Sequence, residues 1–135
     1  MATSKVQTSD QLTSGHQERI LFVDDEMILC ELAREMLTLL NYQVTIANDG
    51  EEALVLIQQA TTPFDLVITD TTMPRLTGTD LIATLKALHL GLPVILTSGQ
   101  GPDGSESWPS EVQFLAKPVT MAELSKAVRA ALAKS

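Results

Sequence analysis

The chain has 135 residues, 17 acidic and 9 basic side chains, and a formal net charge of -8 at pH 7. This length fits one domain, which buries roughly two-thirds of its unfolded surface, and the acidic balance with scattered basic residues argues against nucleic-acid binding through phosphate contacts. Cys30 is the single cysteine, which excludes an internal disulfide. No apolar run reaches about 18 residues, the length needed to span a membrane. We therefore expect a cytoplasmic protein without a nucleic-acid or membrane partner.

The start of the chain differs in composition from the rest. Residues 1–17 are rich in Ser, Thr, Gln and Asp and show no apolar periodicity. Such a segment cannot bury enough apolar surface to offset the conformational freedom that it would lose on ordering. We therefore predict a flexible N-terminal arm over residues 1–17 and one folded domain over residues 18–135.

Five short apolar runs in the folded part have the length of β-strands. Three of them are nearly continuous, as expected for strands covered on both faces of a sheet. The second alternates apolar and polar residues, which favours a place nearer the edge. The predicted strands cover residues 20–23, 43–47, 66–69, 94–97 and 112–116.

Apolar residues between these runs recur at the spacing of amphipathic helices. The first helix follows the first strand, and Asn41 can close it in a left-handed conformation. Its expected inner face consists of Ile28, Leu29, Leu32, Ala33, Met36, Leu37 and Leu40.

Three further helices are predicted by pairs of residues with the spacing of capping boxes. These pairs are Asp49 with Glu52, Thr77 with Asp80, and Thr120 with Glu123. The segment 100–113 is different, because two glycines and two prolines interrupt it. We expect a loop with at most one helical turn there.

The predicted order is β-α-β-α-β-α-β-loop-β-α, with buried strands alternating with amphipathic helices. This order calls for an α/β fold, a doubly wound parallel sheet of five strands with helices on both faces. The fourth helix would be shortened or replaced by a loop.

Polar side chains follow four of the predicted strands: Asp24 and Asp25, Asp70, Ser98, and Lys117. Taken alone, Asp70 is either the working group of a site or a simple turn former. If the strands have the order 2-1-3-4-5, the crevice lies between the first and third, and the carboxylates converge there. The serine hydroxyl and the lysine would flank them.

Three neighbouring carboxylates repel one another, and a divalent cation removes the conflict. Oxygen ligands without His or Cys suit Mg²⁺. Lys117 can pair with Asp70 or with an arriving anion. A carboxylate nucleophile, a divalent cation, a hydroxyl donor and a lysine together fit phosphoryl transfer to aspartate.

Four separated motifs then resemble one family. They read ILFVDDE over residues 20–26, DTTMP over 70–74 with Gly78, PVILTSG over 93–99, and FLAKP over 114–118. In this order and spacing they resemble the receiver domain of bacterial two-component response regulators. The resemblance runs from about residue 19 to the end of the chain and implies a flavodoxin-like fold.

The resemblance also implies roles. It implies that Asp70 is the phospho-acceptor and that Lys117 contacts the phosphate, with the Lys117-Pro118 bond in the cis form. It also implies that Ser98, with Thr97 as its near competitor, supplies a switch hydroxyl. The implied metal site holds Mg²⁺ with Asp24, Asp25, Asp70 and the backbone carbonyl of Thr72. Phe114 takes the place of the switch aromatic, without the hydroxyl of the commoner Tyr.

By the same resemblance, the chain would be a single-domain phospho-acceptor that catalyses its own phosphorylation and dephosphorylation and is not a conventional enzyme. Its partners would be a sensor or hybrid histidine kinase, or a histidine phosphotransfer protein, and a downstream protein that the sequence does not name. Two other readings stay open. One is a receiver-like interaction module that works without phosphorylation. The other is a small aspartyl-phosphate phosphatase, although Thr72 stands where such enzymes carry a second Asp.

Overall fold

The computed structural model describes residues 14–73, 76–88, 91–99 and 112–133. Strands and helices alternate along the chain, and the expected strands are present to within a residue at either end. The strands are β1 (Arg19–Val23), β2 (Gln43–Ala47), β3 (Leu66–Asp70), β4 (Val94–Ser98) and β5 (Gln113–Ala116). The helices are α2 (Met27–Leu39), α3 (Gly50–Gln59), α4 (Gly78–Ala87) and α5 (Met121–Ala133).

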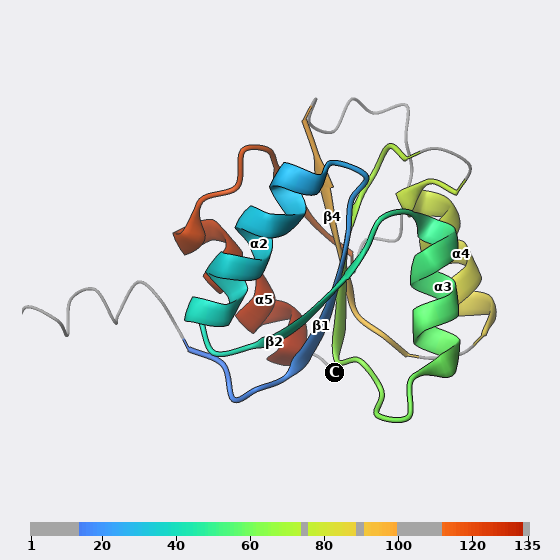
Figure 1. Cartoon of the computed structure of the whole chain (residues 1–135), viewed down its shortest axis with the longest axis horizontal. Helices are drawn as coiled ribbons and strands as arrows, with labels where there is room; N and C mark the ends of the chain where they lie inside the picture. The colour runs from blue at the N-terminus through green and yellow to red at the C-terminus, as the bar shows by residue number, and fades with distance from the viewer. Residues whose placement is uncertain (1–13, 74–75, 89–90, 100–111, 134–135) are drawn as a thin grey trace, which may run out of the picture.

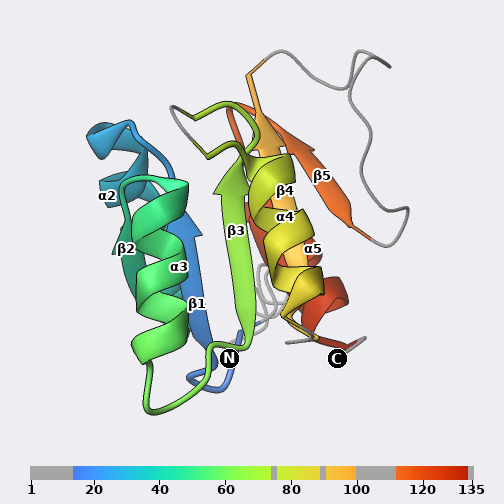
Figure 2. The same cartoon turned by 90° about the vertical axis from the view of Figure 1, so that its right-hand side faces the viewer.

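The five strands form one parallel sheet in the order β2-β1-β3-β4-β5. Helices α2 and α5 cover one face, and α3 and α4 cover the other (Figure 1). Figure 2 shows the strands side by side with their carboxyl ends at one edge. The predicted fold, including the strand order and the place of β2 at the edge, is confirmed.

Alternation of side chains along the strands divides the core into two layers. Ile20 and Phe22 of β1 pack toward α2 and α5, whereas Leu21 and Val23 pack toward α3 and α4. Burying a side chain of this size stabilises a fold by about 1.5 to 3 kcal/mol. Because β1 and β3 lie inside the sheet and are buried on both faces, their ends are held firmly in place.

All three predicted capping pairs are present. The carboxylate of Asp49 accepts a hydrogen bond from the backbone N–H of Glu52 (2.7 Å). The other two are complete capping boxes: Thr77 with Asp80 at the start of α4, and Thr120 with Glu123 before α5. Each cap satisfies backbone donors that a helix leaves unpaired at its first turn.

The predicted inner face of the first helix is partly wrong. Helix α2 contacts the sheet through Cys30, Ala33 and Leu37, which are buried. Ile28 is 82% exposed and Leu32 is 48% exposed. The apolar residues span a wider arc of this helix than the sheet and α5 can cover, so one edge of that arc is left at the surface.

The end of the expected arm is attached to the domain. The backbone N–H of Gly15 donates to Leu40 (2.6 Å), and that of Gln17 donates to Asn41 (2.8 Å). Residues 1–13 of the arm lie outside the described residues, as do residues 100–111 of the predicted Gly- and Pro-interrupted segment.

Helices α2 and α5 have 13 residues each. Within the described ranges, no helix has both the length and the apolar character that crossing a bilayer would require.

Asn41 provides a test of the link between the arm and the domain. Its φ is 72°, its side-chain amide donates to Gly15 (2.7 Å), and its side-chain carbonyl accepts from Gln17 (2.5 Å). We expect Asn41→Ala to lower the free energy of unfolding by about 2 kcal/mol, from left-handed strain and lost hydrogen bonds. Asn41→Gly should lower it by about 1 kcal/mol, because glycine tolerates this φ. Urea unfolding measures both, and equal losses would contradict the assignment.

Candidate functional site

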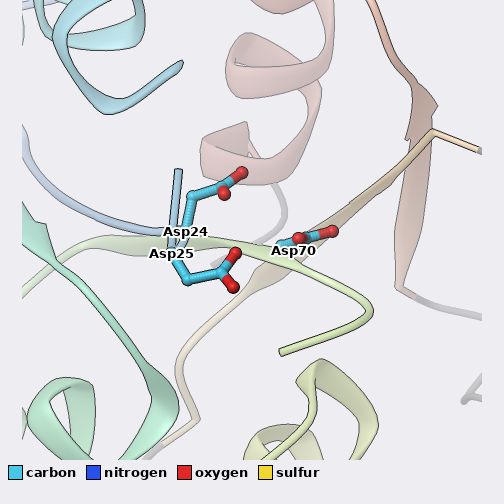
Figure 3. A group of neighbouring side chains, drawn as sticks. All are labelled: Asp24, Asp25 and Asp70. Atoms are coloured by element: carbon cyan, nitrogen blue, oxygen red, sulfur yellow. The ribbon is translucent and has the colours of Figure 1, made fainter. Parts of the chain in front are cut away.

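Three carboxylates meet at the carboxyl edge of the sheet. Asp24 and Asp25 follow the last residue of β1, and Asp70 ends β3. Val23 pairs with Thr69 in the sheet, so the next residues of the two strands lie beside each other. One oxygen from each carboxylate lies within 4.8 Å of the others, and Figure 3 shows the three side chains together. The predicted convergence is therefore present.

Asp24 is the most enclosed of the three and has no exposed surface. Its Oδ1 accepts a hydrogen bond from the backbone N–H of Glu26 (2.9 Å), and its Oδ2 contacts the Lys117 ammonium (3.0 Å). Its own N–H donates to the carbonyl of Ala47 (3.1 Å), which continues the β1–β2 ladder. Both carboxylate oxygens therefore have partners, as a buried charge requires.

Lys117 reaches this edge from the end of β5. Its backbone N–H donates to the carbonyl of Ser98 (2.8 Å), and its ammonium also lies 3.4 Å from Asp70 Oδ2. Burial lowers the pKa of Lys117, but the hydrogen bond and charge of Asp24, together with those of Asp70, outweigh this effect and raise the pKa overall. The side chain is a permanent cation near neutral pH.

Asp70 is only 8% exposed. Burial raises the pKa of its carboxyl group, Lys117 and a hydrogen bond from the backbone N–H of Thr72 oppose the increase, and the charge of Asp24 adds to it. The net shift is upward, so the ionised carboxylate is less favourable in the folded chain than in the unfolded one. A cation placed beside Asp70 would reverse this preference.

The carboxylates fit a small divalent cation. Magnesium–oxygen distances are about 2.1 Å, so ligand atoms on opposite sides of the ion lie about 4.2 Å apart. The carboxylate oxygens lie within 4.8 Å of one another, so they can reach this spacing with at most a small inward movement of the side chains. Asp25 is exposed, which leaves one side of the site open to water and to an incoming group.

The two hydroxyls at the end of β4 differ in their surroundings. Thr97 is 3% exposed and lines a cavity under α2, whereas Ser98 is partly exposed at the edge of the sheet. Ser98 is therefore the more accessible of the two hydroxyls. Phe114, in β5 opposite Leu96, packs against the core layer under α3 and α4. The expected cis Lys117-Pro118 bond is present.

Sequence reasoning gave no role to three residues that shape the site. A Cβ at Gly78 would lie 2.4 Å from the backbone oxygen of Asp70. Glu26 lies 3.8 Å from the Lys117 ammonium. The hydroxyl of Thr71 donates to the carbonyl of Thr97 (2.8 Å) and ties β3 to β4. Gly78 stood within a quoted motif, but close approach to a backbone atom leaves no pattern in a single sequence.

Cys30 contacts the site from the core side, under α2. Its thiol donates to the carbonyl of Asp24 (3.3 Å). Burial raises the pKa of Cys30 to about 11, with a further contribution from the charge of Asp24. The thiol therefore stays protonated and acts as a small buried donor.

Comparison with known proteins agrees with this geometry. The family model of the response regulator receiver domain matches residues 20–129. The chain belongs to the response regulator receiver family. This match includes every residue of the carboxylate cluster and Lys117, and it confirms the resemblance drawn from the four motifs.

Relatives of the receiver include the transcriptional regulatory protein CpxR of Escherichia coli K12, which is 33% identical over 120 residues. The match covers 87% of this chain and 50% of CpxR. The two-component response regulator ARR14 of Arabidopsis thaliana is 39% identical over 93 residues, or 69% of this chain and 24% of ARR14. The chain thus spans half or less of the length of these relatives.

Solved receiver structures share the fold. The response regulator TrrA of Thermotoga maritima, crystallised in complex with Mg²⁺-BeF, superimposes with a TM-score of 0.77 and 29% identity. The match covers 86% of this chain and all of TrrA. Receivers bind Mg²⁺ at an acidic pocket, and the three carboxylates form such an acidic cluster within the described part of the chain.

Lys117→Ala tests the balance of charge in the site. Removing the ammonium leaves Asp24 buried without its cationic partner, so we expect the free energy of unfolding without Mg²⁺ to fall by about 2 to 3 kcal/mol. Saturating Mg²⁺ should restore part of this loss. Urea unfolding with EDTA and with Mg²⁺ measures both values, and Lys126→Ala on the exposed side of α5 is the control. An equal loss with and without Mg²⁺ would contradict the coupling.

Gly78→Ala tests the close approach to Asp70. The added Cβ would meet the Asp70 carbonyl at 2.4 Å, so we expect a loss of about 1 to 3 kcal/mol of stability, as for other overpacked sites. Gly99→Ala is the matched control, because no atom of the described residues lies within 4 Å of a Cβ there. Thermal unfolding compares the two. If Gly78→Ala leaves the thermal stability unchanged, the loop before α4 is not packed tightly against β3.

Proposed function

We propose that this receiver accepts a phosphoryl group on Asp70 from a phosphohistidine, and that the modification switches the binding of a partner protein. The observation that carries the proposal is the meeting of Asp24, Asp25 and Asp70 within 4.8 Å beside the Lys117 ammonium. This arrangement provides a nucleophile together with the positive charge that a phosphoryl group needs.

The transfer step follows from the chemistry of the carboxylate. An oxygen of Asp70 attacks the phosphorus, the phosphorus–nitrogen bond to the imidazole of the donor breaks, and the imidazole leaves with the bonding electrons and takes up a proton. Phosphoryl transfer depends mainly on positioning and on neutralising the phosphoryl oxygens. Lys117 lies 3.4 Å from Asp70, within reach of such an oxygen.

Asp24, Asp25, Asp70 and the backbone carbonyl of Thr72 would hold Mg²⁺. When bound, the ion supplies positive charge to the phosphoryl oxygens. Asp24 is oriented by the N–H of Glu26 and by Lys117. Loss of the phosphoryl group by attack of water at the same site would make the chain its own phosphatase, although not a conventional enzyme.

The switch would involve the ends of β4 and β5. A phosphoryl group adds roughly -1.5 to -2 charge near neutral pH if it resembles phosphoserine. Ser98 can donate its hydroxyl to a phosphoryl oxygen, and Phe114 can follow it because the two strands are paired, Ser98 with Ala116 and Leu96 with Phe114. The downstream partner would recognise the resulting change in this part of the surface.

The donor protein would bind beside the site, on exposed apolar residues of α2. At the start of α2, Met27 is 68% exposed, Ile28 82% and Leu32 48%. We call these three residues the α2 patch. The helix begins three residues after Asp24, so a protein docked on the α2 patch would hold a histidine near the carboxylates. A sensor or hybrid histidine kinase, or a histidine phosphotransfer protein, has the required phosphohistidine.

Incubation with acetyl phosphate and Mg²⁺ tests the proposal. We expect the mass of the intact protein to increase by one phosphoryl group, and EDTA to abolish the increase. Asp70→Asn should stay unmodified. Asp65→Asn is the matched control, because Asp65 lies at the opposite end of β3, where its carboxylate accepts from the N–H of Arg19 (2.8 Å).

The outcomes separate the competing readings. Labelling that persists in Asp70→Asn would refute the assignment of the acceptor. Absence of labelling with every donor, including a phosphorylated histidine kinase, would favour an interaction module that works without phosphorylation. Multiple turnover of a phosphate ester would favour a phosphatase.

A further inference from the structure

A cavity of about 340 Å³ lies between α2, the start of α5 and the sheet. This volume is within the range of sites that bind small organic molecules. Most of its surface is apolar, and the residues that form it come from helices α2 and α5, from strands β1, β3 and β4, and from the loops that follow β1 and β5. The apolar walls include Phe22, Leu29, Ala33, Met36, Ile68 and Leu124.

One wall carries a polar group without a partner. Thr97 is 3% exposed, and among the described residues its Oγ1 has no hydrogen-bond partner. Thr97 lines the cavity, on the face of β4 that packs toward α2 and α5. Buried hydroxyls are usually hydrogen-bonded, because an unpaired one lowers stability. A ligand in the cavity could supply the missing partner.

Water alone is a poor occupant. A buried water molecule needs two to four polar partners, and the walls around Thr97 are apolar. The charged groups at one end of the cavity, Asp24 and Lys117, already pair with each other (3.0 Å). A ligand with an apolar body and a single hydrogen-bonding group matches these walls better.

The charges at that end also restrict the ligand. The Lys117 ammonium is shared between Asp24 and Asp70, so an anionic ligand would compete with two carboxylates for it. A cationic ligand would lie close to that ammonium. The cavity therefore favours a neutral molecule. Leu32 lines the cavity and is 48% exposed, which marks the way in from solvent.

We propose that this cavity is a binding site for a neutral small molecule with an aromatic or aliphatic body and one hydroxyl or carbonyl group that pairs with the hydroxyl of Thr97. The site lies outside the carboxylate cluster but shares the side chains of Asp24 and Lys117 with it. Binding does not depend on phosphorylation of Asp70, so the two proposals can fail separately.

A pair of probes that differ by a single hydroxyl group tests the hydrogen bond. The probes are 2-phenylethanol and ethylbenzene, which lacks the hydroxyl. We expect 2-phenylethanol to bind with about millimolar affinity, as its size allows. Two-dimensional ¹H–¹⁵N NMR titration should show shifts in the amides of α2 and around Thr97, with little change in α3 and α4 on the other face of the sheet.

Thr97→Val keeps the shape of the side chain and removes the hydroxyl. We expect it to weaken 2-phenylethanol binding about 3- to 10-fold, the usual net effect of one hydrogen bond, and to leave ethylbenzene binding unchanged. Thr69→Val is the matched control. Thr69 is equally buried in the neighbouring strand, but its hydroxyl already contacts the carbonyl of Asp70 (3.1 Å).

Filling the cavity provides a second, independent test. Ala33→Leu places three more carbon atoms in it and should abolish binding of both probes. If this variant does not fold, as judged by circular dichroism, Leu32→Phe at the half-exposed mouth replaces it. Leu39→Phe, also exposed on α2 but outside the cavity lining, should bind the probes as the parent protein does.

Three results would overturn the proposal. One is absence of probe binding up to the solubility limit. Another is a Thr97→Val variant in which the affinity for 2-phenylethanol, like that for ethylbenzene, equals the affinity of the parent protein. The third is loss of donor-protein docking in Ala33→Leu without any probe binding in the parent protein, which would assign the cavity to a side chain of the donor.

Discussion

The site depends on the attraction between one ammonium group and carboxylates that otherwise repel each other. Two like charges 4 Å apart repel by roughly 4 kcal/mol at the effective dielectric constant of a protein surface. The Lys117 ammonium lies 3.0 Å from Asp24 and 3.4 Å from Asp70, and it offsets much of this repulsion. The apolar core fixes the positions of the strand ends and so brings the carboxylates together, and Lys117 offsets the unfavourable energy of this arrangement. A bound cation would act in the same direction.

The parallel sheet explains why these groups meet. All five strands run in one direction, so their carboxyl ends and the loops that follow them gather at one edge, as in other open α/β sheets. Helices α2 and α5 cover the face beneath Asp24, and α3 and α4 cover the other. The fold thus leaves one rim free for polar residues and keeps the interior for the apolar ones.

Much of this arrangement could be predicted from the sequence. Buried runs, capping pairs and the left-handed Asn41 leave local patterns. The strand order was an assumption from which the meeting of Asp24, Asp25 and Asp70 was predicted, and the sheet has that order. Contacts that depend on fine placement left no such signal. Examples are the fit of Gly78 against the Asp70 carbonyl and the exposure of Ile28 on an apolar helix face. The cavity beside Thr97 arises from the distance between two helices, which no periodicity encodes.

The contact between Asp24 and Lys117 joins residues that are 93 positions apart in the chain. Loops of that size close late, after local helices and neighbouring strands have formed. A ribosome-bound chain whose β5 is still inside the exit tunnel can place Asp24, Asp25 and Asp70 at the edge of the sheet, but Lys117 cannot yet reach them. In such a nascent chain the carboxylates lack the ammonium that offsets their repulsion, so the charge balance of the site is complete only after β5 and Lys117 have been synthesised.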